Sequence, residues 1–140
     1  MTGNVTSVNA VVISKNKQPF GRYGQTARLA ICISYDQING KYSTSVMLSF
    51  TDDDGMCTFS DFRGSGILAV FDNGEVDNRW SLISMAANRR SLYMVNTDKI
   101  NSFVKQLKAS KQARIQVNIK GGGQKTFDFN VEGLQWDFEN

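Results

Sequence analysis

The stretch from residue 96 to residue 136 constrains the fold most, because its hydrophobic period changes from that of a helix to that of a strand. Thr97 is a good N-cap residue, and Asp98 places negative charge in the first turn, at the positive end of the helix dipole. Apolar side chains then recur with helical spacing at Ile100, Phe103, Val104 and Leu107. The pattern predicts an amphipathic helix over about residues 97–112.

Behind this helix the period becomes two. One face of a first strand carries Ile115, Val117 and Ile119, and one face of a second strand carries Phe127, Phe129 and Val131. Three glycines at 121–123 separate the two runs. The helix is therefore expected to lead into a β-hairpin.

Alternating apolar residues predict further strands in the first half of the chain. Val5–Ile13 indicates an opening strand, and Ala27–Tyr35 and Tyr42–Phe50 are the best patterned. The Asn39-Gly40 pair between the last two favours a tight hairpin turn.

The middle of the chain contributes shorter strands, expected at Cys57–Arg63, Ile67–Phe71 and Leu92–Val95. Ile67–Phe71 is apolar on both faces, which is typical of the middle of a sheet, and a turn after it predicts pairing with Val76–Ile83. We expect a single mainly β domain over residues 1–140: an antiparallel β-sandwich or partly open barrel, with one helix in the C-terminal half followed by the hairpin.

Composition bounds the function further. The 140 residues, 41% of them hydrophobic, suffice for one core. The net charge of +3 comes from 16 basic and 13 acidic residues mixed along the chain, a balance that mainly favours solubility. No apolar run approaches the ~20 residues that span a bilayer. The N-terminus shows no basic region followed by an apolar one, so we expect a signal peptide to be absent or already removed.

The chain contains no histidine, which excludes Ser-His-Asp and Cys-His catalysis and histidine metal sites. Lysine, carboxylate pairs and cysteine remain, but no spacing singles out a catalytic set, and no cofactor motif is present. Asp52, Asp53 and Asp54 lack the ligand spacing of a calcium loop, so we expect a solvated turn and no metal site.

The two cysteines, Cys32 and Cys57, are candidates for a disulfide. Such a bond would close a loop of about 25 residues and add about 3 kcal/mol of stability in the chain-entropy model. The alternative is two separate buried thiols.

Basic and aromatic side chains that interleave along the chain are candidates for a partner or nucleic-acid surface. They are Arg22, Tyr23, Arg28, Tyr35, Lys41, Tyr42, Arg79, Trp80, Arg89 and Arg90. The alternative is that they are scattered surface residues.

The second half of the chain resembles the small secreted proteins of the invasion-associated locus B kind and the type VI secretion-associated proteins similar to them. The resemblance rests on residues 67–74 (ILAVFDNG), the strand at 91–95, Phe103 and Leu107 in the helix, and residues 127–136 (FDFNVEGLQW). Val70 departs from the pattern, since a basic residue often precedes the Phe-Asp pair there. The resemblance implies an all-β fold, an extracytoplasmic setting and a non-catalytic accessory role.

These observations predict a non-catalytic protein-binding module, an accessory or inhibitory protein associated with secretion or virulence, whose partner is another protein. A periplasmic or secreted location follows if the resemblance holds, and a cytoplasmic one otherwise. The alternative is a single-stranded nucleic-acid-binding β-barrel protein. An enzyme that uses lysine or carboxylates would need a deep pocket with converging ionisable groups.

Overall fold

The structure is a computed structural model. It describes residues 6–21, 23–38, 40–52, 55–60, 67–72, 74 and 83–136, with the backbone alone at 6, 7, 38 and 83–85.

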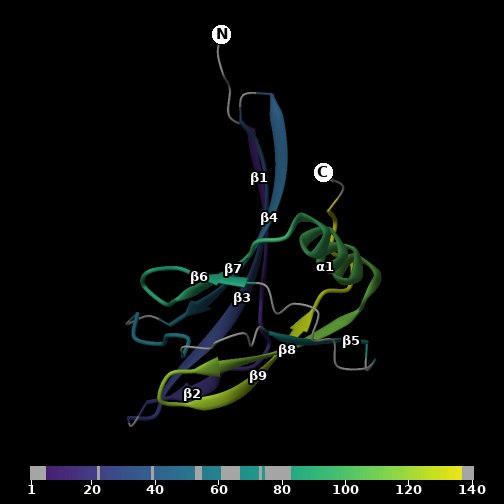
Figure 1. The fold of residues 1–140 in the computed structure, drawn as a ribbon. Coiled ribbons are helices and arrows are strands. Elements are labelled where there is room, and N and C mark those ends of the chain that lie inside the picture. The colour runs from purple at the N-terminus through teal and green to yellow at the C-terminus, as the bar shows by residue number, and fades with distance from the viewer. Residues whose placement is uncertain are drawn as a thin grey trace.

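The described chain forms nine strands and one helix (Figure 1). In order they are β1 (Thr6–Ile13), β2 (Gln18–Phe20), β3 (Gln25–Ile38), β4 (Lys41–Thr51), β5 (Leu68–Phe71), β6 (Ile83–Met85), β7 (Ser91–Met94), α1 (Thr97–Ala109), β8 (Gln112–Ile119) and β9 (Gly123–Asn130). The predicted mainly β class with one helix in the second half is confirmed.

The strands make two antiparallel sheets that pack as a sandwich and do not close into a barrel. A six-stranded sheet has the order β1-β3-β4-β7-β6, with β2 pairing with the start of β3, and a three-stranded sheet has the order β5-β8-β9. β3 and β4 form the predicted hairpin, and Gly40 adopts φ of 76° at its turn. Asn39, the other turn residue, lies outside the described residues.

The core lies between the inner faces of the two sheets. The long hairpin contributes alternate residues, and so do β8 and β9: Leu29, Ile31, Ile33, Val46, Leu48, Phe50, Ile115, Val117, Ile119, Phe127 and Phe129, all buried. The predicted inward faces of both hairpins are therefore confirmed. β3 and β4 extend beyond this core, and we call residues 34–45, around the Gly40 turn, the arm (Figure 1).

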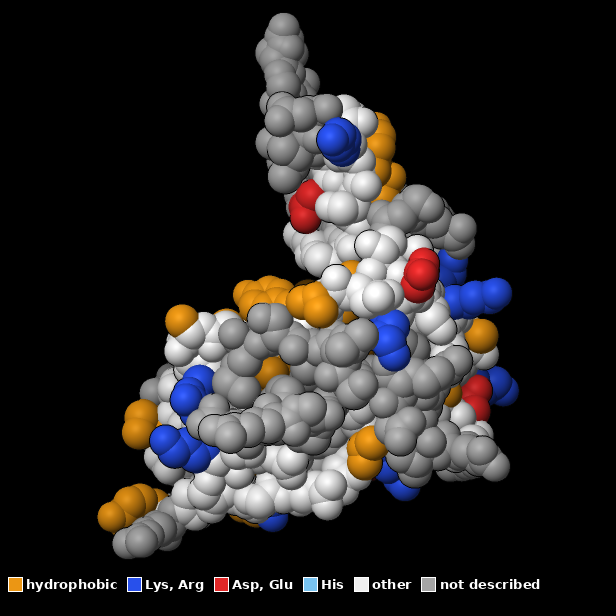
Figure 2. All heavy atoms as spheres, viewed as in Figure 1, with side chains coloured by type: hydrophobic (Ala, Val, Ile, Leu, Met, Phe, Trp, Pro, Cys, Tyr) orange, Lys and Arg blue, Asp and Glu red, His pale blue; other side chains and the backbone are white. Residues whose placement is uncertain are grey.

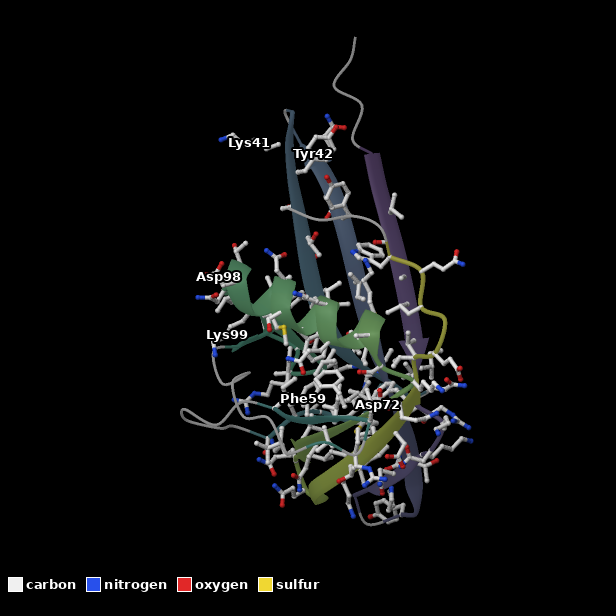
Figure 3. All side chains as sticks on the ribbon, turned by 90° about the vertical axis from the view of Figure 1, so that its right-hand side faces the viewer. Lys41, Tyr42, Phe59, Asp72, Asp98 and Lys99 are labelled. Carbon is white, nitrogen blue, oxygen red and sulfur yellow. The ribbon has the colours of Figure 1, made fainter. Side chains whose placement is uncertain are left out.

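α1 lies beside the arm and packs on the inner face of the six-stranded sheet (Figures 1 and 3). Its buried residues are the four predicted ones, Ile100, Phe103, Val104 and Leu107. Both of its ends differ from the prediction. Asn96, not Thr97, is the N-cap, and its Oδ1 accepts the Lys99 N–H at 3.1 Å. The helix ends at Ala109 because Ser110 is extended and β8 begins at Gln112.

Among the described residues, the Ile67–Phe71 strand pairs with a strand that the sequence did not predict as its partner. β5 pairs with β8, with Ala69 opposite Ile115, and forms an edge of the three-stranded sheet. Asp72 at its end takes φ of 50°, and its Oδ1 accepts the N–H groups of Lys111 and Gln112 at 2.8 and 2.9 Å. Of the return strand expected at 76–83, residues 76–82 lie outside the described residues, and Ile83 pairs with β7.

The strand expected at Cys57–Arg63 is reduced, in its described part, to one bridge between Phe59 and Ile119. The Phe59 N–H donates to Arg89 O at 2.8 Å, next to β7, and the Ser60 N–H donates to Asn118 O at 3.0 Å on β8. This segment therefore joins the two sheets. Residues 61–63 lie outside the described residues.

The predicted disulfide is absent, and both cysteines are free. Cys57 is fully buried in the core between the sheets. Cys32 lies next to Ile31 on β3 and therefore points to the opposite face of the sheet. A sheet separates the two thiols, so the alternative of two separate cysteines holds.

We expect Leu107→Ala to lower the free energy of unfolding by about 2–5 kcal/mol, because it empties a fully buried position under α1. Lys105→Ala, on the exposed side of the same helix, should change it by less than about 0.5 kcal/mol. Urea denaturation followed by circular dichroism measures both. Equal effects of the two substitutions would contradict the packing of the helix.

Candidate functional site

The structure divides the predicted surface residues into separate groups. Arg22, Arg79 and Trp80 lie outside the described residues. Tyr23 and Arg28 lie at the start of β3, whereas Tyr35, Lys41 and Tyr42 lie in the arm, and Arg89 and Arg90 lie in the turn before β7. β3 has 14 residues and is about 45 Å long at ~3.3 Å per residue. The described candidates therefore do not form one continuous surface.

Arg28 is used inside the fold. Its Nη1 donates to the carbonyl oxygens of Ser14 and Lys15, at 2.8 and 2.6 Å. These bonds hold the chain that leaves β1 against the start of β3. The Arg28 guanidinium is thus occupied by backbone carbonyls rather than presented to a ligand.

Arg90 is a second structural arginine. Its Nη1 lies 2.8 Å from Asp52 Oδ1 and donates to Cys57 O at 2.9 Å, and its Nη2 donates to Phe50 O at 3.2 Å. The Asp52 and Arg90 side chains are 2% and 21% exposed, so the ion pair is largely buried. It ties the loop after β4 to the turn before β7.

Asp52 differs from the solvated turn that was expected for the aspartate run, because its side chain is only 2% exposed. Its Oδ2 accepts the N–H groups of Met56 and Cys57 at 2.7 and 3.1 Å, four and five residues further on, whereas an Asx turn bonds the backbone two residues on. Asp53 and Asp54 lie outside the described residues. Within the described ranges, no three Asp, Glu or Cys side chains converge as metal ligands would.

The arm carries a small aromatic cluster. The rings of Tyr35 and Tyr42 stack with centroids 5.3 Å apart and planes 21° apart. Figure 3 shows Lys41 and Tyr42 near the far end of the arm, beyond the first residues of α1 at Asp98 and Lys99. Both tyrosines occupy inward positions of their strands; Tyr35 packs against the edge of the core, and Tyr42 lies further out in the arm. Tyr42 is consequently half exposed, and the rings cover each other.

A different surface lies on the outer face of the six-stranded sheet. Strand register places Val11 opposite Cys32, Cys32 opposite Met47, and Met47 opposite Tyr93, in one row across β1, β3, β4 and β7. Paired residues in antiparallel strands point to the same face, so these four side chains are neighbours. Val11 and Tyr93 are 57% and 41% exposed, and Ile13 beside Val11 is 52% exposed. We call Val11, Cys32, Met47 and Tyr93 the outer row.

The surroundings of the outer row are small and almost uncharged. The remaining described outward positions on β3, β4 and β7 are Thr26, Arg28, Ala30, Ser34, Asp36, Lys41, Ser43, Ser45, Ser49, Thr51 and Ser91. Arg28 is held by backbone carbonyls, and Asp36 and Lys41 lie out in the arm. Figure 2 shows charged side chains scattered over the visible described surface, with hydrophobic ones gathered where the arm meets the body. The outer face is a flat patch with little charge at its centre.

Sequence reasoning did not single out Val11, Ile13, Met47 or Tyr93. Alternation predicts only that the outward positions of β3 and β4 form the more polar face of a sheet. The signal in the sequence is the composition of the middle of that face, at alternate positions in 30–34 and 43–49: serine, alanine, cysteine and methionine, without the lysine and glutamate that normally solvate an exposed strand.

A polar hollow of about 160 Å³ lies by β5 and β8 on the outside of the three-stranded sheet. Its charged lining is Lys15, Asp72, Arg114 and Asp128. Arg114 Nε lies 2.8 Å from Asp128 Oδ1, and Lys15 Nζ donates to Gln112 Oε1 at 2.7 Å. Asp72 is bonded to backbone N–H groups, so two cations and two carboxylates balance within the hollow.

Cys32 is the ionisable member of the outer row. Partial burial raises the pKa of its thiol above the usual value, because the thiolate loses solvation. The protonated, weakly nucleophilic form therefore predominates at neutral pH. Cys32 contributes an apolar contact to the surface rather than a reactive group.

No protein-family model, curated protein or solved structure matches the chain. Among the described residues, no helix has the length and apolar character that crossing a membrane requires.

We expect Arg90→Met to destabilise the protein by about 3–5 kcal/mol, because it leaves the Asp52 carboxylate buried without its cation. Arg114→Met is the matched control: its ion pair with Asp128 is exposed, so the loss should stay below about 1 kcal/mol. Urea unfolding midpoints measure both. If Arg90→Met costs no more than Arg114→Met, the structural role assigned to Arg90 is wrong.

We expect iodoacetamide to add one label to the native protein and two after unfolding, because Cys32 is partly accessible and Cys57 is buried. Because the pKa of Cys32 is raised in the folded state, native labelling should reach half its maximal rate at a higher pH than that of an unfolded cysteine. Intact mass spectrometry gives the counts, and Cys32→Ser should take up no label in the native state. Two labels, or none, on the native wild type would contradict the placement.

Proposed function

We propose that this protein is a non-catalytic binding module that recognises another protein through the outer row. The observation that carries the proposal is the row itself: Val11, Cys32, Met47 and Tyr93 side by side on a flat sheet face with little charge around them. Interface centres are depleted in charged residues and enriched in tyrosine and methionine. The outer row has that composition.

The rigidity of the sheet supports the same proposal. The row spans four hydrogen-bonded strands whose other face is packed in the core, with Ile31, Leu48 and Leu92 behind it. A surface held in this way loses little conformational entropy when a partner binds. The accessory role implied by the resemblance to the invasion-associated locus B family fits such a surface.

The polar hollow supports the non-catalytic part of the proposal. Its charged side chains contact each other or backbone groups, so they offer a ligand a balanced lining rather than a free base or nucleophile. The raised pKa of Cys32 likewise disfavours nucleophilic chemistry on the outer row.

A second candidate function is binding of single-stranded nucleic acid by the arm. The stacked rings of Tyr35 and Tyr42 favour it, because unpaired bases stack on aromatic side chains. Lys41 points to the opposite face of β4 (Figure 3). This site would lie in the arm, away from the outer row.

The test compares two double variants, each of which adds one lysine and one glutamate. Met47→Lys with Tyr93→Glu places a cross-strand ion pair in the outer row and leaves the net charge unchanged. Gln116→Lys with Thr126→Glu places the same pair on the three-stranded sheet and is the control. Each immobilised protein is exposed to lysate of the source organism, and captured proteins are quantified by mass spectrometry with soluble wild type as competitor.

We expect the wild type and the control to capture the same protein saturably. The outer-row variant should bind that protein at least about tenfold more weakly, which corresponds to a loss of about 1.4 kcal/mol of binding free energy. Equal capture by all three would contradict the proposal. The proposal would also be contradicted if soluble wild type competed for no captured protein while the protein bound a labelled oligonucleotide in a salt-dependent way. Loss of that binding in Tyr42→Ala would establish the second candidate.

A further inference from the structure

The two sheets end in strands that differ in how their free edges are covered. β5 and β6 are only four and three residues long. β9 has eight residues, but the side chains of Asn16, in the loop before β2, and of Gln18, the first residue of β2, bond to its edge. Asn16 Nδ2 and Gln18 Nε2 donate to Thr126 O at 3.0 and 2.6 Å, and Asn16 Oδ1 accepts the Asp128 N–H at 2.8 Å.

β1 is the contrasting case. It is the eight-residue edge of the six-stranded sheet, and within the described residues only β3 pairs with it (Figure 3). The Ser14 N–H donates to Leu29 O at 2.8 Å, which continues the β1–β3 register. Because backbone groups of alternate residues point to opposite sides of an antiparallel strand, those of Asn9, Val11 and Ile13 point away from β3.

The amino-acid composition of β1 also does nothing to prevent another strand from pairing with its edge. The sequence of β1 (TSVNAVVI) contains no charged residue and no proline, which are the usual means of preventing edge-to-edge pairing. Val11 and Ile13, whose backbone groups point outward, also expose about half of their side chains. Within the part of the chain that the structure describes, β1 therefore offers unpaired hydrogen-bonding groups together with apolar side chains.

We propose that β1 pairs antiparallel with β1 of a second copy of this chain, joining two six-stranded sheets across a twofold axis. Two identical strands run antiparallel when a twofold axis perpendicular to the sheet relates them, so each supplies to the other the bonds that it receives. The absence of charge favours this partner, because β1 meets its copy without like-charge repulsion, and Val11 and Ile13 gain apolar neighbours across the new pair. A charged peptide would find no complementary side chain on β1.

The dimer is expected to be reversible. The contact consists of one eight-residue strand from each copy, about 26 Å long. The area that one strand edge buries is small compared with the ~800 Å² per partner of standard stable interfaces. Pairing at β1 leaves Met47 and Tyr93 uncovered and joins the outer faces of the two copies. The dimer shares Val11 with the outer row, but it does not require the partner proposed above and is measured without any other protein.

The experiment is sedimentation of the whole chain from about 1 μM to about 1 mM, the range in which contacts worth about 4–8 kcal/mol dissociate. The wild-type average mass should rise from 15.6 kDa toward twice that value. Val11→Pro removes an outward N–H that the fold does not use, and Val11→Lys adds a charge that faces its copy, so both should stay monomeric. Tyr93→Lys, on the same face but away from the edge, should dimerise like the wild type.

Amide hydrogen exchange by NMR gives a second readout at single residues. The N–H groups of Asn9, Val11 and Ile13 should exchange rapidly in dilute protein and become protected at high concentration. Those of Ala10 and Val12, which point to β3, should be protected in both, and their protection in Val11→Pro and Val11→Lys shows that the variants are folded.

A wild type that stays monomeric throughout would overturn the proposal, as would folded Val11 variants that dimerise normally. If the wild type is monomeric but Val11→Lys loses capture of another protein, self-pairing is wrong and the loss is assigned to the outer row, of which Val11 is a member.

Discussion

The long antiparallel pairing of β3 with β4 is the constraint on which the rest of the structure depends. It runs from Arg28 opposite Thr51 to Ile38 opposite Lys41, and its alternation puts every second side chain on one face. The inner face receives the three-stranded sheet and α1, which together bury the large apolar residues. Because the hairpin is longer than the layer that covers it, its far end forms the arm.

The same alternation produces the outer face. Because Ile31 and Leu48 point into the core, the neighbouring residues Cys32 and Met47 point outward. Val11 pairs with Cys32 and Tyr93 pairs with Met47, so these two side chains lie on the same outer face. Charged residues on this face lie away from the row, with Arg28 near the start of β3 and Asp36 and Lys41 in the arm. Arg90 and Asp52 hold a loop, and Arg114 pairs with Asp128 on the opposite sheet. The outer face consequently stays both flat and nearly neutral at its centre, which is the property from which a binding role is inferred.

Local patterns were readable from the sequence, whereas long-range pairings were not. The buried face of α1 and the alternation of β8 and β9 depend on neighbours within a few residues, so periodicity was enough to predict them. The partner of β5 depends on residues about 45 positions away, since Ala69 lies opposite Ile115. The turn after β5 resembled a hairpin, but the Asp72 carboxylate instead binds the chain where β8 begins.

The site was predicted less well than the fold. Arg28 and Arg90 were grouped with the surface candidates because composition cannot show that a guanidinium bonds to backbone carbonyls. The sequence did not predict that Tyr35 and Tyr42 lie together, and the structure shows that their rings stack. Tyr93 and Val11 could not be connected from the sequence, because two strands separate them in the sheet.

The most direct test of the account is whether the outer face is open to solvent in the isolated protein. A soluble paramagnetic agent broadens the NMR signals of exposed methyl groups and leaves buried ones unaffected. In dilute protein the account requires strong broadening for Val11 and Ile13, clear broadening for Met47, and little for Ile31, Val46 and Leu48. Protection of Val11 and Met47 equal to that of Leu48 would mean that the outer face is covered, and it would contradict the account.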